Sequence, residues 1–374
     1  MKVALVLPGG VDRTGEYRVI PTFLALIERL ARRHEVHVFV LHQEARAATW
    51  PLRGAVIHNI GEGWTRLRAI TAICVEHHRA PFVVVQAIFS GSCSRVAVCA
   101  AKLLRAASVV HIAGGELVAM PDIDYGGRRR LRGRMREAFI LGAANAVTAA
   151  SAPILASLAM LDIPARRIPL GVDLAAWPPQ PPRQRTAPRA RLIHVASLNR
   201  VKDQTTLLHA LAALRDAGID FDMTFVGVDT LHGAIEATSS RLGLGEHVRF
   251  LGFKTQRDLR PLLAGADLLV MSSRHEAGPL VLLEAAVVGV PTVGTAVGHI
   301  AEWSPVAALA VPVGDWHAMA AAIRRLLEND GLRCQIAHAA QQRALAEDAD
   351  YTACAFEALY DEVITLDARA ARTT

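Results

Sequence analysis

The sequence predicts an α/β protein made of two doubly wound parallel sheets in series. Short apolar runs bounded by Gly or Pro alternate with longer amphipathic stretches, which is typical of strands followed by helices. The 374 residues exceed what one hydrophobic core usually holds. A Pro-rich stretch at 174–189 interrupts the alternation, which then starts again, so we expect one sheet on either side of it.

The first half begins with an apolar strand, and its later strands read as uninterrupted apolar runs. The run Val83–Val85 suits a parallel strand that helices cover on both faces. Amphipathic stretches between the runs predict the covering helices. We expect strands at 2–7, 36–41, 81–85 and 108–113, and helices at 16–32 and 92–104.

The second half repeats this pattern after five prolines within the interval 174–189. We expect a helix at 203–216 with Asp203 as its N-cap, and helical structure from about Asp315 onward. Strands are expected at 192–196, 223–226, 248–251, 268–271 and 292–294, and late helices at 316–328, 331–347 and 349–364. The predicted domains are 1–173, a linker at 174–189, a second domain at 190–345, and a C-terminal helix at 346–374 that could cross back to the first domain.

Composition and charge narrow the class of protein. With 52% hydrophobic and 20% charged residues, a disordered chain is excluded. The net charge of +6 suits phosphate-bearing small molecules or an anionic membrane surface, but is too small and diffuse for a nucleic-acid footprint. The five cysteines lack the spacing of a zinc site. The apolar run Val3–Leu7 is too short for a signal peptide, and no run reaches membrane-span length, so we expect a cytoplasmic protein.

Six arginines stand within the nine residues Arg128–Arg136. One interpretation is a solvated helix face or a loop followed by one. The other is a site for anionic lipid headgroups or a phosphorylated acceptor, which would give a peripheral contact with the inner face of a membrane. The sequence leaves both open.

Ligands of open α/β sheets bind where the strands end, so the loops there are the candidate site. The Gly9–Gly10 loop follows the first strand, and Arg13 and Arg18 beside it could pair with negative charge; a flexible loop is the alternative. In the loop from Ser197 to Gln204, Lys202 precedes a helix start, where an ammonium and the positive helix end could both face a diphosphate. A solvated surface loop is the alternative here.

The loop after the 268–271 strand carries two carboxylates, Glu276 and Glu284. Pro279 opens the following helix, and backbone N–H groups near Gly278–Leu280 are free to hold a phosphate. Glu284 lies inside an apolar helix and needs a polar partner, which ribose or sugar hydroxyls could supply. The alternative is a half-exposed Glu paired with a local Arg.

Together these features resemble a known family. Glu276-x7-Glu284 in a strand–loop–helix setting, Lys202 after a strand, the turn Leu170–Asp173, the Gly9–Gly10 loop and Gly298–Ile300 resemble a retaining GT-B glycosyltransferase of the large family 4 group. The resemblance covers roughly residues 1–345. It implies two Rossmann-like domains facing across a cleft, with a nucleotide-diphosphate sugar held mainly by the second and the acceptor by the first.

The resemblance also implies roles for single residues. Glu284 would bind the ribose hydroxyls, Glu276 the hydroxyls of the donor sugar, and Lys202 the diphosphate. Glu276 and Lys202 are the implied catalytic residues. The other implied donor-binding residues are Gly278, Pro279, Leu280, Ser197, Asn199, Arg200, Gly9, Gly10 and Phe253.

The chain departs from the family pattern in two places. Many members carry Arg where this chain has Ser197, so Arg200, Arg13 or Arg18 would have to replace that cation. Many carry His where this chain has Ala113. His111 lies two residues earlier and is either an acceptor contact or a packed core histidine. The acceptor-side candidates are Arg13, Arg18, Glu116 and His111.

The implied reaction is retaining transfer of a sugar to a hydroxyl of a glycan, a lipid-linked sugar or a metabolite. No Asp-x-Asp pair stands in a likely donor loop, so neither a metal nor another cofactor is predicted. The alternatives are a sugar-nucleotide epimerase of the same architecture and a catalytically weak nucleotide-sugar-binding partner protein. A nicotinamide dehydrogenase is disfavoured, because the first loop is not GxGxxG.

Overall fold

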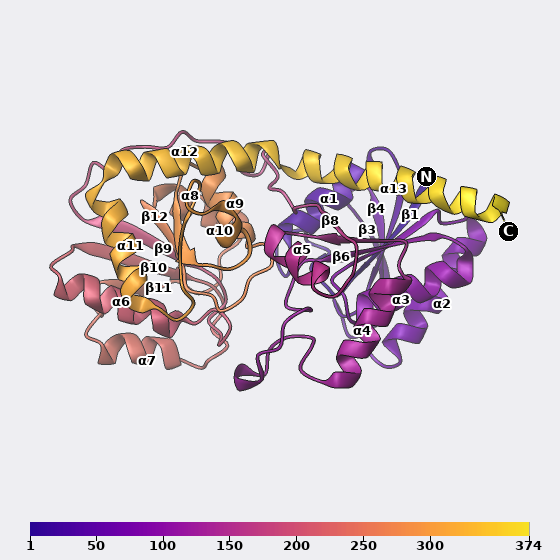
Figure 1. Ribbon diagram of the computed structural model, residues 1–374, viewed down its shortest axis with the longest axis horizontal. Coiled ribbons are helices and arrows are strands. Elements are labelled where there is room, and N and C mark those ends of the chain that lie inside the picture. The colour runs from indigo at the N-terminus through magenta and orange to yellow at the C-terminus, as the bar shows by residue number, and fades with distance from the viewer. Residues whose placement is uncertain (374) are drawn as a thin grey trace. The chain divides into compact units, whose positions relative to one another are not determined.

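The computed structural model describes the backbone of residues 1–373 and the side chains of residues 1–366. The chain divides into two compact units, of which the first contains residues 1–173 and 347–374 and the second residues 174–346. Each unit has its own sheet and its own hydrophobic core (Figure 1). The predicted α/β class is therefore correct.

The first unit is an eight-stranded sheet in the order β3-β4-β2-β1-β5-β6-β7-β8, parallel except for the β3–β4 pair. Helices α1 and α13 pack together on one side of it and α2 and α3 on the other (Figure 1). Its strands are β1 (Lys2–Leu7), β2 (Glu35–Val40), β3 (Ala48–Leu52), β4 (Ala55–Asn59), β5 (Val84–Ile88), β6 (Ala107–Ile112), β7 (Ala146–Ala149) and β8 (Arg166–Arg167). Its helices are α1 (Pro21–Ala31), α2 (Thr65–Arg79), α3 (Ser92–Leu104), the 3-10 turn η1 (Pro121–Ile123), α4 (Leu131–Ala143), α5 (Ala152–Ala159) and α13 (Ala349–Thr373).

The second unit is a six-stranded, wholly parallel sheet in the order β11-β10-β9-β12-β13-β14. Its strands are β9 (Ala190–Val195), β10 (Phe221–Val226), β11 (Val248–Phe250), β12 (Leu268–Met271), β13 (Thr292–Thr295) and β14 (Leu309–Val311). Its helices are α6 (Gln204–Asp216), α7 (Ala234–Arg241), α8 (Gln256–Gly265), α9 (Leu280–Val287), α10 (Gly298–Trp303), α11 (Trp316–Glu328) and α12 (Asp330–Ala346). Asp203 caps α6 as predicted, since its side chain accepts from the Thr206 N–H.

In the first unit, one helix start was predicted wrongly and one hairpin was not predicted. The first helix begins at Pro21 rather than at residue 16, because Arg18 has a left-handed backbone (φ 51°) and the Ile20 N–H donates back to the Gly10 carbonyl. The β3–β4 hairpin was not predicted. Its turn, Arg53-Gly54, has two positive φ angles, as tight hairpins need, but Pro51 within β3 weakens the strand pattern.

The Pro-rich segment, predicted as a linker, packs against the second unit. The Gln180 N–H donates to the Val287 carbonyl at 3.1 Å, and Arg183 donates to the carbonyls that end α8. Gly289 is needed under this segment, because a Cβ there would lie 2.7 Å from the Pro182 nitrogen. The segment therefore has defined partners within this unit.

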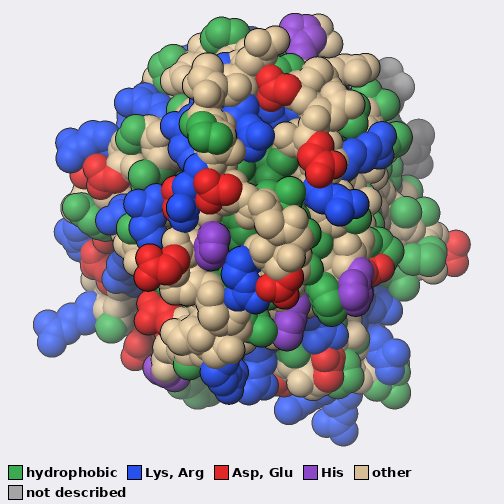
Figure 2. Space-filling view, turned by 90° about the vertical axis from the view of Figure 1, so that its left-hand side faces the viewer, with side chains coloured by type: hydrophobic (Ala, Val, Ile, Leu, Met, Phe, Trp, Pro, Cys, Tyr) green, Lys and Arg blue, Asp and Glu red, His purple; other side chains and the backbone are tan. Residues whose placement is uncertain are grey.

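The surface of the second unit carries charges of both signs. Figure 2 shows Lys and Arg interspersed with Asp and Glu on the face that it presents. Among the helices of the described residues, none combines the length and apolar character that a membrane crossing needs.

Candidate functional site

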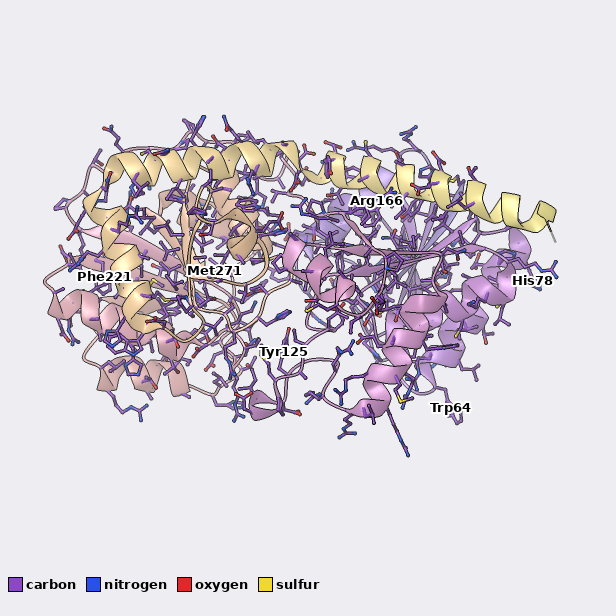
Figure 3. All side chains as sticks on the ribbon, viewed as in Figure 1. Trp64, His78, Tyr125, Arg166, Phe221 and Met271 are labelled. Atoms are coloured by element: carbon purple, nitrogen blue, oxygen red, sulfur yellow. The ribbon has the colours of Figure 1, made fainter. Side chains whose placement is uncertain are left out.

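The carboxyl ends of β9 and β12, which are neighbours in the second sheet, bring two loops together. β12 ends at Met271, labelled in Figure 3, and the second of these loops follows it. The Ser272 hydroxyl donates to the Lys202 carbonyl at 2.8 Å, and the Arg274 N–H donates to the Val201 carbonyl at 2.8 Å. The two loops are thus fixed to each other by backbone-directed hydrogen bonds, at the edge where α/β sheets bind ligands.

These loops hold the Lys202 ammonium against the Glu276 carboxylate. Lys202 Nζ lies 2.5 Å from Glu276 Oε1, and the Ser273 hydroxyl donates to the same oxygen at 2.6 Å. The Lys202 side chain is 23% exposed and that of Glu276 10%. A partly buried, charge-assisted pair is pre-oriented, so both groups meet an incoming ligand in a fixed position.

A buried polar layer lies beneath this pair. His194 is fully buried, its Nδ1 donates to the Val270 carbonyl at 2.9 Å, and its Nε2 lies 3.2 Å from the Gln204 amide nitrogen. Burial lowers the pKa of His194 to about 4, so the ring is neutral. The Gln204 amide also donates to the Ser197 carbonyl. This layer, which was not predicted, ties β9 to the loop that carries Lys202.

Gly298 supports the Glu276 loop from the other side. Its φ is +51°, and an added Cβ would lie 3.0 Å from the Glu276 carbonyl oxygen and 3.1 Å from the Ala277 carbonyl oxygen. Only glycine fits both the backbone conformation and the close approach. The α9 helix starts after this loop, at Leu280 with Pro279 as N-cap, and its first N–H groups have no partner within the helix.

Glu284 is buried inside α9, and its partner is an amide rather than an arginine. Gln256, the first residue of α8, donates to Glu284 Oε1 at 3.1 Å. Burial raises the pKa of Glu284 to about 7, and the Gln256 hydrogen bond opposes this rise only in part. A carboxylate with one weak partner has acceptor capacity left for hydroxyl groups.

The titration of Glu284 makes a testable contribution to stability. Because the folded state holds this proton up to about pH 7 and the ordinary pKa is 4.5, the free energy of unfolding falls as the pH rises through that interval. Glutamine does not titrate, so the free energy of unfolding of Glu284→Gln should rise relative to that of the wild type. We expect this relative rise to be on the order of 3 kcal/mol between pH 4.5 and pH 7. Urea unfolding at both pH values measures this; a pH-independent difference would contradict the assignment.

The other predicted donor-side residues lie nearby with different roles. The Asn199 side chain accepts from the Lys202 N–H at 3.1 Å and so shapes the loop. Ser197 contributes its carbonyl to the buried layer, Arg200 is exposed, and Phe253 is 52% exposed. Arg200 therefore has freedom to reach a ligand, while Asn199 and Ser197 act through the loop.

In the first unit, the Gly9–Gly10 loop is held by a residue that was not predicted. The Gln43 side chain accepts from the Gly10 and Val11 N–H groups at 2.7 and 3.1 Å and donates to the Arg18 carbonyl. Gly10 has φ +88°, and a Cβ there would lie 2.8 Å from Ile20. This loop is therefore well ordered by side-chain contacts rather than loosely flexible.

The two arginines beside this loop already have partners. Arg13 forms a two-point ion pair with Glu44 at 2.8 and 3.0 Å and stacks over the Trp50 ring. Arg18 donates to the Gln43 carbonyl at 2.7 Å. Either arginine would have to exchange these contacts to meet a ligand phosphate.

A separate cavity of about 180 Å³ lies in the first unit where β5 and β6 end. Glu116 accepts there from the Ser90 and Gly114 N–H groups at 3.0 and 2.7 Å, and burial raises its pKa. Phe89, which precedes this loop, has a strained backbone with φ +72°. The cavity is lined by Ser90, Gly91, Ser94, Arg95, Glu116, Gly127, Gly133, Arg136, Glu137 and Ile140.

His111 does not reach this cavity's lining. It is fully buried in the sheet, with Nδ1 2.9 Å from the Thr148 hydroxyl and its ring edge-on to Phe356. Burial lowers the pKa of His111 to about 3, so the ring is neutral. Its surroundings fit the interpretation of a packed core histidine.

Comparison with known proteins agrees with this geometry. Residues 181–343 match the family described as glycosyl transferases group 1. The chain is 34% identical over 218 residues to D-inositol 3-phosphate glycosyltransferase of Salinispora arenicola, which covers 52% of this chain and 48% of that protein. The chain thus spans about half the length of this curated relative.

Solved structures match over nearly the whole chain. Sucrose-phosphate synthase from Thermosynechococcus elongatus has a TM-score of 0.81 at 18% identity, covering 98% of this chain and 100% of that chain. Anabaena HepE in complex with UDP-glucose has a TM-score of 0.74 at 18% identity, covering 97% and 100%. At such identities the likeness establishes the fold. The chain therefore has the GT-B fold, and its second unit is a domain of the glycosyl transferases group 1 family.

Proposed function

We propose that this protein is a retaining glycosyltransferase of family 4 that moves a sugar from a nucleotide-diphosphate sugar to a hydroxyl acceptor. The observation that carries the proposal is the Lys202–Glu276 pair at 2.5 Å, with Glu284 buried in the following helix. At this sheet edge Lys202 and the start of α9 suit a diphosphate, Glu276 suits the hydroxyls of a sugar, and Glu284 suits those of a ribose. The HepE complex with UDP-glucose supports this class of donor.

The main catalytic task is to stabilise charge on the departing diphosphate. Lys202 and the N–H groups at the start of α9, beside Gly278–Leu280, supply positive charge in a fixed position, so they act most strongly when that charge develops. Glu276 accepts from the hydroxyls of the donor sugar. Glu284 accepts from the ribose. Attack from the face that the diphosphate leaves would retain the anomeric configuration.

The acceptor is proposed to bind the first unit, at the cavity where β5 and β6 end. Glu116 and Glu137 can accept from acceptor hydroxyls there, and Arg95 and Arg136 can meet an anionic group. Relatives include a D-inositol 3-phosphate glycosyltransferase and an amylovoran biosynthesis glycosyltransferase, which supports a glycan, lipid-linked sugar or metabolite as acceptor.

We further propose that the reaction needs no metal ion, because Lys202 and the start of α9 already provide the charge that a metal would supply. The expected result is that EDTA leaves the transfer rate unchanged within about twofold. A rate that falls at least tenfold and returns with added Mg²⁺ or Mn²⁺ would overturn this part of the proposal.

Product analysis tests the proposed reaction. The protein is incubated with UDP-, GDP- and ADP-sugars, with and without mono- and disaccharide, inositol phosphate and lipid-linked acceptors. We expect nucleotide-diphosphate release that depends on an acceptor, and a product whose anomeric configuration by NMR equals that of the donor. Conversion of the donor sugar without acceptor would identify an epimerase instead, and an inverted product would exclude the retaining reaction.

A further inference from the structure

The α4 helix of the first unit carries an exposed apolar stripe. Leu131, Met135 and Phe139 are 62%, 66% and 74% exposed. They are spaced four residues apart, so they lie on one face that spans about 80° of the helix. Large apolar side chains that gather on one face of a helix, rather than scattering singly, mark an interaction surface.

The opposite face of α4 is already occupied by the unit itself. Gly133, Arg136, Glu137 and Ile140 line the cavity described above, and their mean direction is about 150° from that of the stripe. The helix is therefore anchored through one face, and the stripe is turned away from that anchor. The three side chains of the stripe therefore stay exposed when this unit folds.

Uncompensated positive charge surrounds the stripe. Of the six arginines in Arg128–Arg136, Arg128 lies 4.0 Å from Glu137, and Arg129 pairs with Asp124. The remaining four have no carboxylate within ion-pair distance among the residues that the structure describes: Arg130, Arg132, Arg134 and Arg136. Arg132 and Arg134 project on either side of the stripe.

The neighbouring helices of this unit also carry positive groups. Burial, and then the guanidinium groups of Arg66 and Arg136, lower the pKa of Arg95, so positive groups of α2, α3 and α4 lie near one another. Trp64, labelled in Figure 3, precedes α2 and is 84% exposed. Trp64 precedes Arg66 by two residues, and an exposed indole suits a membrane–water interface.

We propose that α4, through Leu131, Met135 and Phe139 and the flanking arginines, docks this protein on the surface of an anionic lipid bilayer. Charge complementarity selects this partner: the arginines meet lipid phosphates while the stripe enters the acyl boundary. A soluble phosphate would engage the arginines but leave the stripe in water. The proposal does not rest on the transferase activity, and it follows the second of the two interpretations of Arg128–Arg136.

Vesicle flotation of the full chain tests the proposal. We expect binding to vesicles of equal parts phosphatidylglycerol and phosphatidylcholine, at least about tenfold weaker binding to pure phosphatidylcholine, and a decline with added salt. The variant Leu131→Ser/Met135→Ser/Phe139→Ser should lose at least about tenfold in binding, and so should Arg130→Gln/Arg132→Gln/Arg134→Gln. Because all six side chains are exposed, both variants should keep the wild-type melting temperature.

The matched control is Leu103→Ser/Met160→Ser, which removes a 69% exposed side chain of α3 and a 79% exposed side chain at the end of α5, and it should bind as the wild type does. Failure of the wild type to bind anionic vesicles would overturn the proposal, as would unchanged binding of the stripe variant. Concentration-dependent self-association that the stripe variant abolishes, without vesicle binding, would assign the stripe to a second copy instead. Equal binding to anionic and to pure phosphatidylcholine vesicles would contradict the proposed contact between the arginines and lipid phosphates.

Discussion

Lys202→Ala is expected to lower kcat by about 10²- to 10³-fold, with a smaller effect on the KM for the donor. The ammonium is held in place by Glu276 and by the hydrogen bonds between the two loops, so no reorganisation is needed as the diphosphate gains charge. Replacement with alanine removes this fixed charge and leaves a largely buried carboxylate without its cation. Steady-state kinetics with the donor identified in the product assay measure the loss.

Lys102→Ala is the matched control for this prediction, because it removes an exposed lysine from α3 of the first unit. It should leave kcat and the melting temperature unchanged. If Lys202→Ala keeps more than a third of the wild-type kcat, Lys202 does not stabilise the leaving group. Circular dichroism of both variants separates a catalytic loss from unfolding.

Glu276→Gln is expected to separate turnover from nucleotide binding. The amide keeps the shape of the side chain but removes the charge that pairs with Lys202, so the ammonium becomes freer to meet a diphosphate. We expect kcat to fall about 10²-fold, while the nucleoside diphosphate without a sugar binds as tightly as to the wild type or more tightly. Kinetics together with calorimetric titration of the diphosphate measure both effects.

Glu236→Gln provides the control here, because Glu236 is an exposed carboxylate on α7 of the same unit. Normal turnover by Glu276→Gln would refute its contact with the donor sugar. A loss of diphosphate binding as large as the loss of kcat would instead make Glu276 a structural support for Lys202.

Most of the strands, and the loops that follow them, could be predicted because their signals are local. The apolar run that became β12, followed by Glu276, Pro279 and Glu284, marks a buried strand, a loop and a helix within seventeen residues, 268–284. The Asp203 N-cap is equally local, since its side chain bonds three residues ahead. Patterns of this kind depend on spacing alone.

The partners of these residues could not be predicted, because they come from distant parts of the chain. Gln256 meets Glu284 across 28 residues, and Gln43 meets Gly10 across 33. A glutamine in a predicted loop carries no sign of the backbone or carboxylate that it will bind. The partner of Arg13, beside the first loop, could not be predicted for the same reason, because Glu44 is 31 residues away.

The exposed stripe on α4 shows a further limit of sequence patterns. The spacing of Leu131, Met135 and Phe139 would normally predict a face packed on the core. In the structure the core-facing positions are Ile140 and Leu141, and the stripe is exposed. Which face of a helix meets the core depends on how the helix sits on the sheet, and that is a property of the assembled unit.

The most direct test of the proposed donor site is thermal unfolding of the protein with UDP, GDP, ADP, their sugar conjugates and NAD, because a ligand that binds only the folded state raises the melting temperature. We expect one nucleotide diphosphate and its sugar conjugate to raise it selectively, and Lys202→Ala and Glu284→Ala each to remove most of the shift. A shift with NAD alone, or a nucleotide shift that both variants retain, would contradict a nucleotide-sugar site at the ends of β9 and β12.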